Sequence, residues 1–196
     1  MKKKRLVCIV EGKGEVEAIP NLCSRILASL SLHDWLVDQA PIRQPRGHLV
    51  DARIAGPSRP CRPEGMTKAL SMAWARNPDA VLVMCDSDDD CPSIWAKSVP
   101  IKIPSGRPVA AVMAVREFEG WLLRVFNDNE LGRIRVVDPE RIRNAKGRLE
   151  QLVPGYAPTT HQLMMTRKLD ISAVRNRSRS FDKLVRTIGA LCGGTG

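Results

Sequence analysis

Aromatic residues are scarce in this chain of 196 residues, and the common zinc-binding patterns are missing. Phe, Trp and Tyr make up 4% of the sequence and hydrophobic residues 43%, so we expect an aliphatic core. The six cysteines form no C-x-x-C pair and the three histidines no His-x₃-His pair, which argues against a structural zinc site. No apolar run approaches the roughly 20 residues that span a bilayer, so we expect no membrane association.

We expect neither a signal peptide nor a P-loop near the amino terminus. The basic start, Met1–Arg5, resembles the charged end of a signal peptide, but the apolar stretch behind it ends at Glu11. That stretch is shorter than the roughly 7–15 apolar residues of a secretion signal, so a cytoplasmic protein is expected. Gly12 and Gly14 follow a predicted strand, but the pattern G-x-x-x-x-G-K-[ST] is absent.

Positive charge dominates the chain and is concentrated at its two ends. The formal net charge is +10; residues 2–5 contribute +4 and residues 124–196 contribute +7, while residues 6–123 sum to −1. Phosphate groups attract such basic surfaces regardless of sequence, which makes a nucleic acid, DNA or RNA, the expected partner. The ordinary solubility of a basic protein is the competing explanation.

Short apolar runs alternate with amphipathic segments. The runs 5–10, 80–85 and 108–115 lack strict polar alternation, which is typical of strands buried on both faces. This pattern predicts an α/β sandwich with a mostly parallel sheet, in which residues 1–126 form a catalytic core and residues 127–196 a small, basic, mostly helical extension packed on it. The other predicted elements are a helix to about residue 32, a strand near residues 35–42, and helices near residues 66–77, 139–152 and 180–191.

A long loop is predicted over residues 43–65, where prolines, glycines and five arginines are found. Loops of this length inside compact domains are often functional. Basic side chains here and near the carboxy terminus could follow a phosphate backbone, although solvation of an ordinary surface also explains them. The candidates for nucleic-acid binding are Arg46, Arg53, Arg59, Arg167 and Lys168.

Carboxylates directly follow three of the predicted buried strands. Ligands of open α/β sheets bind beyond the carboxyl ends of the strands, so neighbouring strands would bring these side chains to one edge. Crowded carboxylates raise one another's pKa, and a hard cation such as Mg²⁺ or Mn²⁺ removes that cost. The side chains concerned are Glu11 and Glu15 after the first strand, Asp86, Asp88 and Asp90 after the third, and Glu117 and Glu119 after the fourth.

Two of these pairs have a spacing that suits a shared ion. Asp86 and Asp88, two residues apart on an extended segment, would point the same way and bind one ion. Glu117 and Glu119 would do so only if no helix has begun there, and would then share a second ion with the two glutamates of the first strand. Two ions about 4 Å apart suit in-line phosphoryl transfer. Helix capping by the later aspartates and a helix-dipole role for the second glutamate are the plainer alternatives.

The order strand, E-G-K, strand, D-x-D resembles the Toprim domain of topoisomerases, primases, small RNA-maturation nucleases and overcoming-lysogenization-defect (OLD) nucleases. The resemblance implies a Toprim-like sandwich in which Glu11 acts as general acid/base or metal ligand. Asp86 and Asp88 then belong to the same catalytic set. Lys13 could neutralise the scissile phosphate or be a solvated turn lysine.

The OLD branch adds an acidic residue matched by Glu15 and a later R-E-x-E-x-x-L segment matched by residues 116–122. D-S-D-D-D-C-P, A-V-R-E-F-E-G-W-L-L and a terminal S-x-S-F are similar to a bacterial family known only as a domain of unknown function. Its members often neighbour an ATPase gene, which implies a nuclease that works with an ATPase partner in phage defence. A non-catalytic module that binds such a partner or nucleic acid, and a regulatory module that binds a nucleotide, stay open, as does a homodimer.

Overall fold

The sheet consists of parallel strands in the order β2-β1-β4-β5, and β3 pairs with β1 further along the edge that β2 occupies. The computed structural model describes residues 3–193; Met1 and Lys2 of the basic amino-terminal segment and residues 194–196 lie outside it. The strands are β1 (Lys4–Val10), β2 (Trp35–Val37), β3 (Ile42–Arg43), β4 (Ala80–Asp86) and β5 (Val109–Ala114).

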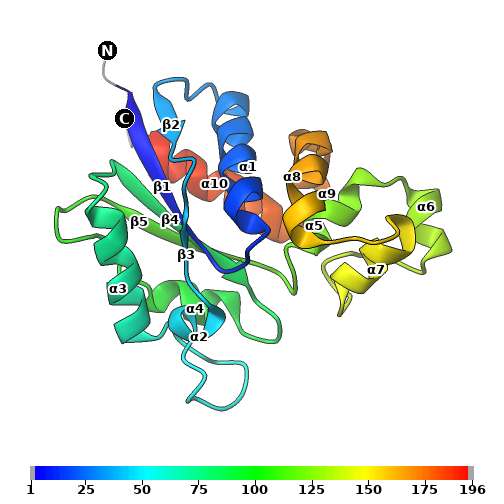
Figure 1. Ribbon diagram of the computed structural model, residues 1–196, viewed down its shortest axis with the longest axis horizontal. Helices are drawn as coiled ribbons and strands as arrows, with labels where there is room; N and C mark the ends of the chain where they lie inside the picture. The colour runs from blue at the N-terminus through cyan, green and yellow to red at the C-terminus, as the bar shows by residue number, and fades with distance from the viewer. Residues whose placement is uncertain (1–2, 194–196) are drawn as a thin grey trace.

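Helices cover both faces of this sheet (Figure 1). Helices α1 (Glu15–Ser29) and α10 (Arg179–Gly193) pack on one face, and α3 (Pro63–Trp74) and α4 (Pro92–Ser98) on the other. The predicted α/β sandwich with a mostly parallel sheet is therefore confirmed, and the architecture is consistent with a Toprim-like sandwich.

The alternation of side chains along the strands explains the two layers. Leu6 and Cys8 of β1 belong to the hydrophobic core beneath α1 and α10, whereas Val7 and Ile9 belong to the core beneath α3 and α4. All four side chains are completely buried, as expected for a strand in the interior of a parallel sheet.

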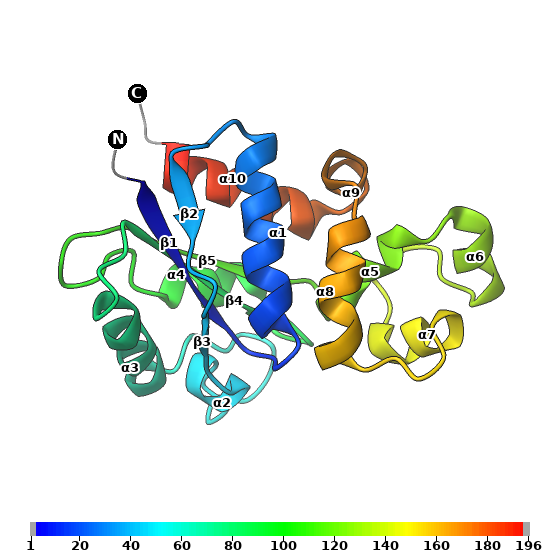
Figure 2. The ribbon, with the colours of Figure 1, turned by 45° about the horizontal axis from the view of Figure 1, so that its top comes forward.

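The helices that do not cover the sheet have at most 11 residues each. Those between residues 119 and 177 gather at one end of the molecule (Figure 2). None of the helices within residues 3–193 combines the length and the apolar character needed to cross a membrane. The remaining helices are α2 (Arg46–Leu49), α5 (Glu119–Leu122), the 3₁₀ helix η1 (Leu123–Val125), α6 (Asp128–Arg133), α7 (Ala145–Leu152), α8 (Pro158–Lys168) and α9 (Ile171–Arg177).

The single strand expected near residues 35–42 is two short strands, because the Asp38 side chain accepts a hydrogen bond from the Ala40 backbone N–H (3.0 Å) and turns the chain before Pro41. The boundary at residue 126 stays a prediction. Phe181 of α10 shares a hydrophobic core with strand β1, so the carboxy-terminal helix completes one face of the sandwich.

Candidate functional site

Three neighbouring parallel strands of the sheet end at the same edge. Strand β1 ends at Val10, β4 at Asp86 and β5 at Ala114, so the segments that follow them lie side by side. The first of these segments leads into α1 with Glu15, and the third into α5 with Glu119. The sheet thereby brings together carboxylates that are more than 100 residues apart in the sequence.

Glu15, Asp86 and Glu119 form what we call the inner cluster. Glu15 is 5% exposed and Glu119 6% exposed, while Asp86 is partly buried. Glu15 Oε2 accepts hydrogen bonds from the backbone N–H groups of Glu11 (3.1 Å) and Gly12 (3.2 Å), which fixes the carboxylate over the turn between β1 and α1. Backbone donors hold this carboxylate in place, and no cationic side chain among the described residues pairs with it.

The other two members of the inner cluster are also held by neutral donors. Asp86 Oδ1 accepts from the backbone N–H of Phe118 (2.7 Å). Glu119 Oε1 accepts from the Tyr156 hydroxyl (3.2 Å) and from Gln162 Nε2 (3.0 Å), both buried. Among the described residues no donor contacts Glu15 Oε1, Asp86 Oδ2 or Glu119 Oε2, so each carboxylate keeps one oxygen for a ligand.

Burial without a counter-ion makes ionisation of the inner cluster costly. Burial raises the pKa of Glu15 to about 7, and the charges of Glu11 and Glu119 add to the rise. Burial also raises the pKa of Asp86 well above its usual range, with further contributions from Glu15 and Glu119. The pKa of Tyr156 is raised as well, first by burial and then by the adjacent Glu119. Negative charge is therefore poorly compensated in the inner cluster.

A second group, which we call the outer cluster, is organised around Arg46. Its guanidinium group contacts Glu11 Oε2 (3.3 Å), Asp88 Oδ2 (3.1 Å) and Asp90 Oδ2 (2.5 Å). Arg59 Nε contacts the other oxygen of Asp90 at 2.6 Å. Burial raises the pKa of Glu11, although Arg46 opposes the rise. In the outer cluster, arginines supply the positive charge that the carboxylates need.

The chain turns sharply directly after β4. Asp88 has a φ of 47° and Arg116, on the neighbouring segment, a φ of 63°; the Asp88 backbone N–H donates to the Arg116 carbonyl oxygen (2.9 Å). Ser87 Oγ accepts from the Arg116 backbone N–H (2.8 Å) and fixes the two turns together. The extended geometry predicted for D-x-D is therefore wrong: Asp86 joins the inner cluster and Asp88 the outer one.

After the turn at Arg116, the side chains of Glu117 and Glu119 have different partners. Glu117 Oε2 accepts from the backbone N–H of Lys146 (3.0 Å) near the start of α7, whereas Glu119 opens α5 and faces Tyr156. The condition set for this pair, an extended chain, is not met, because Arg116 has a left-handed conformation and a helix begins two residues after Glu117. Whether either residue binds a metal stays a prediction.

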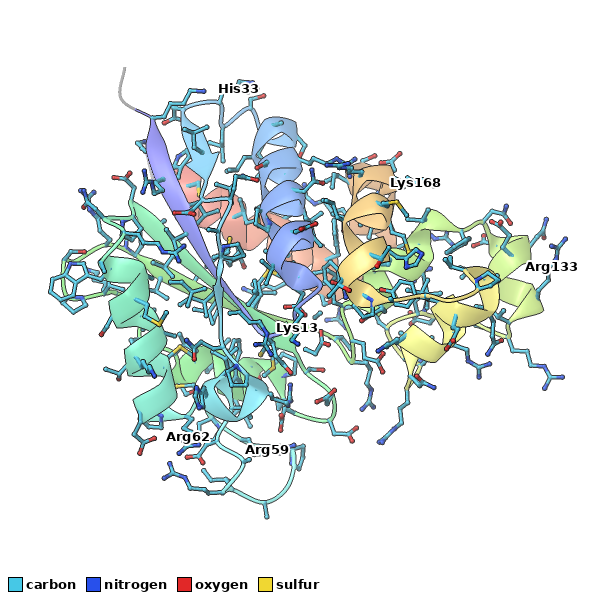
Figure 3. All side chains as sticks on the ribbon, viewed as in Figure 1. Lys13, His33, Arg59, Arg62, Arg133 and Lys168 are labelled. Carbon is cyan, nitrogen blue, oxygen red and sulfur yellow. The ribbon has the colours of Figure 1, made fainter. Side chains whose placement is uncertain are left out.

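The basic candidates differ in their surroundings. Lys13 is exposed near the start of α1, and Arg59 lies on the loop below it in Figure 3. Arg53 is 60% exposed and pairs with Asp51. Arg46 and Arg59 are engaged with carboxylates, and Arg167 and Lys168 are exposed at the end of α8, which carries Lys168 away from Lys13 (Figure 3). Their nucleic-acid contacts stay predictions.

Sequence reasoning did not identify Tyr156 and Gln162 as members of the site. They reach Glu119 only because α8 folds back against α1, a contact between segments far apart in the sequence. The one local signal is Gly14: a Cβ there would lie 2.7 Å from the Pro158 carbonyl carbon and would collide with the Gln162 side chain. A glycine at this position lets α8 approach closely.

The donor chemistry of the inner cluster fits a hard divalent cation. Carboxylate oxygens are the protein ligands that Mg²⁺ and Mn²⁺ prefer, and three carboxylates each keep a free oxygen here. As placed, no three His, Cys, Asp or Glu side chains of residues 3–193 are grouped tightly enough to hold one ion. Binding of one ion by all three would therefore require their side chains to move, and the number of ions stays a prediction.

A small hollow adjoins the outer cluster at Asp88. It has a volume of about 280 Å³ and is lined by Asp88, Asp89, Arg116, Glu117 and Arg143. The guanidinium groups of Arg116 and Arg143 both contact Asp89 Oδ1, the latter at 2.8 Å. Two arginines at the mouth of an acidic site can bind an anion such as a phosphate.

The comparisons with known proteins give a family and no activity. The family model described as Domain of unknown function (DUF4276) matches residues 10–189, which include both clusters, the last residue of β1 and the other four strands. No curated protein and no solved structure matches the chain. Since the family model covers most of the chain, the protein belongs to the family of the domain of unknown function DUF4276.

Proposed function

We propose that the protein is a Mg²⁺- or Mn²⁺-dependent phosphoryl-transfer enzyme, a nuclease of the Toprim/OLD type that acts on DNA or RNA. The observation that carries this proposal is the inner cluster, where Glu15, Asp86 and Glu119 meet without a cationic partner and burial raises the pKa of Glu15 and Asp86. Carboxylates with such raised pKa values are concentrated at functional sites, where a bound ligand can compensate their charge. The resemblance to OLD nucleases supports an ATPase partner and a role in phage defence.

The residues take different roles in this proposal. Glu15, Asp86 and Glu119 would hold the ion through their free oxygens, while backbone N–H groups, Tyr156 and Gln162 keep them in place. When bound, Mg²⁺ or Mn²⁺ supplies Lewis-acid stabilisation of a phosphate and lowers the pKa of water.

Glu11 lies between the two clusters and suits a different task. It is half-buried and its pKa is raised by burial, so it can accept and return a proton near the reacting phosphate. Arg46 holds one Glu11 oxygen at 3.3 Å and orients the carboxylate. Lys13, exposed two residues further along, would approach the phosphate from solvent.

The experiment is a cleavage assay on purified protein with single- and double-stranded DNA and RNA in the presence of Mg²⁺ or Mn²⁺. We expect Glu11→Gln and Asp86→Asn to reduce the cleavage rate by at least about 100-fold, because each removes a carboxylate that acts on the reacting groups. Glu150→Gln is the matched control, since Glu150 is exposed on α7. Cleavage that survives both substitutions in folded protein would refute the assignment.

One observation favours a second candidate, a non-catalytic module that binds an ATPase partner or nucleic acid. The Arg46 guanidinium occupies the centre of the outer cluster, where a metal ion would otherwise compensate Glu11 and Asp88. Isothermal titration calorimetry separates the two candidates. Micromolar binding of Mn²⁺ that Asp86→Asn removes supports the enzyme, whereas the absence of binding below millimolar Mn²⁺, together with co-purification of an ATPase, supports the module.

A further inference from the structure

A basic groove runs along the free edge of the sheet, beside β5. Strand β5 is the last strand of the order β2-β1-β4-β5, and helices α4 and α10 lie on opposite faces beside it. The space between them has a volume of about 700 Å³ and is lined by Ala111 and Met113 of the strand. A neighbouring hollow of about 470 Å³ continues along α10 past Ala110.

The backbone of β5 presents unused hydrogen-bonding groups to this groove. The Val81 N–H donates to the Pro108 carbonyl oxygen (3.0 Å) and the Ser87 N–H to that of Ala114 (2.8 Å), so the even-numbered residues of β5 face β4. The backbone N–H and C=O groups of the odd-numbered residues therefore point away from β4, towards the groove. Among the described residues, no hydrogen bond is made by the outward N–H and C=O of half-buried Ala111 or of Met113, which is 2% exposed.

Both ends of this free edge are closed by the protein itself. The Val109 N–H donates to the Ile101 carbonyl oxygen at 2.7 Å, and the Val115 N–H points to Ser180 Oγ at 3.4 Å. The open stretch between them accommodates only a short extended segment. Five residues, 110–114, lie between these two closed positions, so the open stretch matches a peptide strand of about five residues at about 3.3 Å per residue.

Positive side chains surround the groove. Of the described residues, Asp182 is the one acidic residue in its lining, and it pairs with both Arg175 (2.8 Å) and Arg186 (2.8 Å). The other basic side chains of the rim are exposed, and no ion pair is seen for three of them within residues 3–193. These three are Lys97, Arg179 and Lys183.

We propose that this groove binds an acidic, extended peptide segment of a partner protein, which adds a strand to β5. An exposed strand edge pairs with an incoming strand through main-chain hydrogen bonds, and charge on the flanking side chains selects the partner. The free C=O groups of Ala111 and Met113 need donors, which a peptide N–H supplies and a phosphate backbone does not. A second copy of this chain is a poorer occupant, because Lys97 and Lys183 would face their own like charges.

The test measures binding of a fluorescein-labelled octapeptide of alternating glutamate and valine by anisotropy. We expect saturable binding that weakens with salt, and no binding of the same peptide with lysine in place of glutamate. Two N-methylated versions provide the structural control: one is methylated at the backbone amides of the glutamates and the other at those of the valines. In strand addition only one amide set faces β5, so one version should lose at least about tenfold in affinity and the other should not.

Charge reversal locates the site on the protein. Lys183→Glu should weaken peptide binding at least about tenfold, whereas Lys68→Glu, an equally exposed change on α3, should leave it unaltered. Equal binding of both methylated peptides, or equal effects of the two substitutions, would overturn the proposal. It would equally be overturned if a single-stranded oligonucleotide bound at Lys183 while the peptide did not, or if the chain formed a dimer through β5 that excluded the peptide.

Discussion

Replacing Glu15 by glutamine removes an ionisable group from the inner cluster while preserving the size of the side chain. Glu15 is 5% exposed, and burial raises its pKa from 4.5 to about 7. One oxygen of the glutamine amide can still accept hydrogen bonds from the Glu11 and Gly12 backbone N–H groups. The substitution therefore tests the cost of the buried charge separately from packing.

The magnitude follows from the shift in pKa. A rise of about 2.5 units corresponds to about 3 kcal/mol of differential free energy between the two protonation states. Because the folded protein binds the proton more tightly than the unfolded chain, this stability is present below about pH 4.5 and is lost as the pH rises through about 7. The free energy of unfolding of the wild type relative to Glu15→Gln should thus fall by about 3 kcal/mol between about pH 4 and about pH 8.

Urea denaturation of both proteins across this pH range is the assay. Glu17→Gln is the matched control, since Glu17 is exposed on the same first turn of α1 and should give a curve parallel to that of the wild type. If the proposed ion binds, Mg²⁺ at about 100 times its Kd should restore about 2.7 kcal/mol to the wild type at pH 8, and less to the variant. Parallel curves for the wild type and Glu15→Gln would refute the claim that this carboxylate is buried without compensation.

Two further predictions concern contacts that hold the site. Gly14→Ala should destabilise the protein by about 1–3 kcal/mol, because its Cβ would displace the Gln162 side chain; Gly47→Ala, where no atom lies within 4 Å, is the control, and equal effects in urea denaturation would contradict the contact. Ser180→Ala should cost about 1–3 kcal/mol, since it leaves the buried Trp121 indole N–H without its acceptor at 2.7 Å. A loss within the error of thermal unfolding measurements would contradict this account.

Much of the sheet could be predicted from the sequence because its strands are buried on both faces. The runs that became β1, β4 and β5 contain almost only Val, Leu, Ile, Ala, Met and Cys, which leaves few alternatives to an interior strand. Strands β2 and β3 have three and two residues, and their separation depends on the Asp38 turn. Such short edge strands carry too few residues for a periodicity to be recognised.

The candidate site could be predicted only in part. That Glu11, Asp86 and Glu119 come to one edge follows from parallel strands, which is a topological property that the sequence pattern conveys. Which oxygens face one another depends on the left-handed residues Asp88 and Arg116, and neither residue type requires a positive φ, which is uncommon outside glycine. The predicted pairs therefore failed where backbone turns replaced extended chain.

The position of Arg46 was beyond sequence reasoning for a different reason. It lies on α2, within a loop that is fastened by the Val50–Cys61 bridge and by a hydrogen bond from the Trp95 indole N–H to the Leu49 carbonyl oxygen (2.9 Å). The indole contact joins residues 46 positions apart in the sequence, and Arg46 reaches Asp90 across 44 positions, so no local pattern predicts where the guanidinium group lies. A loop rich in arginine and proline indicates a functional segment, but its sequence does not show which carboxylates the arginines will contact.

The two clusters differ in how their negative charge is balanced, and this difference decides where a cation would gain most. In the outer cluster Arg46 and Arg59 already neutralise the completely buried Asp90 carboxylate, so a divalent ion would have to displace a guanidinium group. In the inner cluster only neutral donors hold Glu15 and Asp86. A bound ion would offset the burial and the mutual repulsion that raise the pKa of both carboxylates. Glu11 lies beside both environments, so the positive charge of an ion bound beside Asp86 should lower the pKa of Glu11 and compete with Arg46 for its carboxylate.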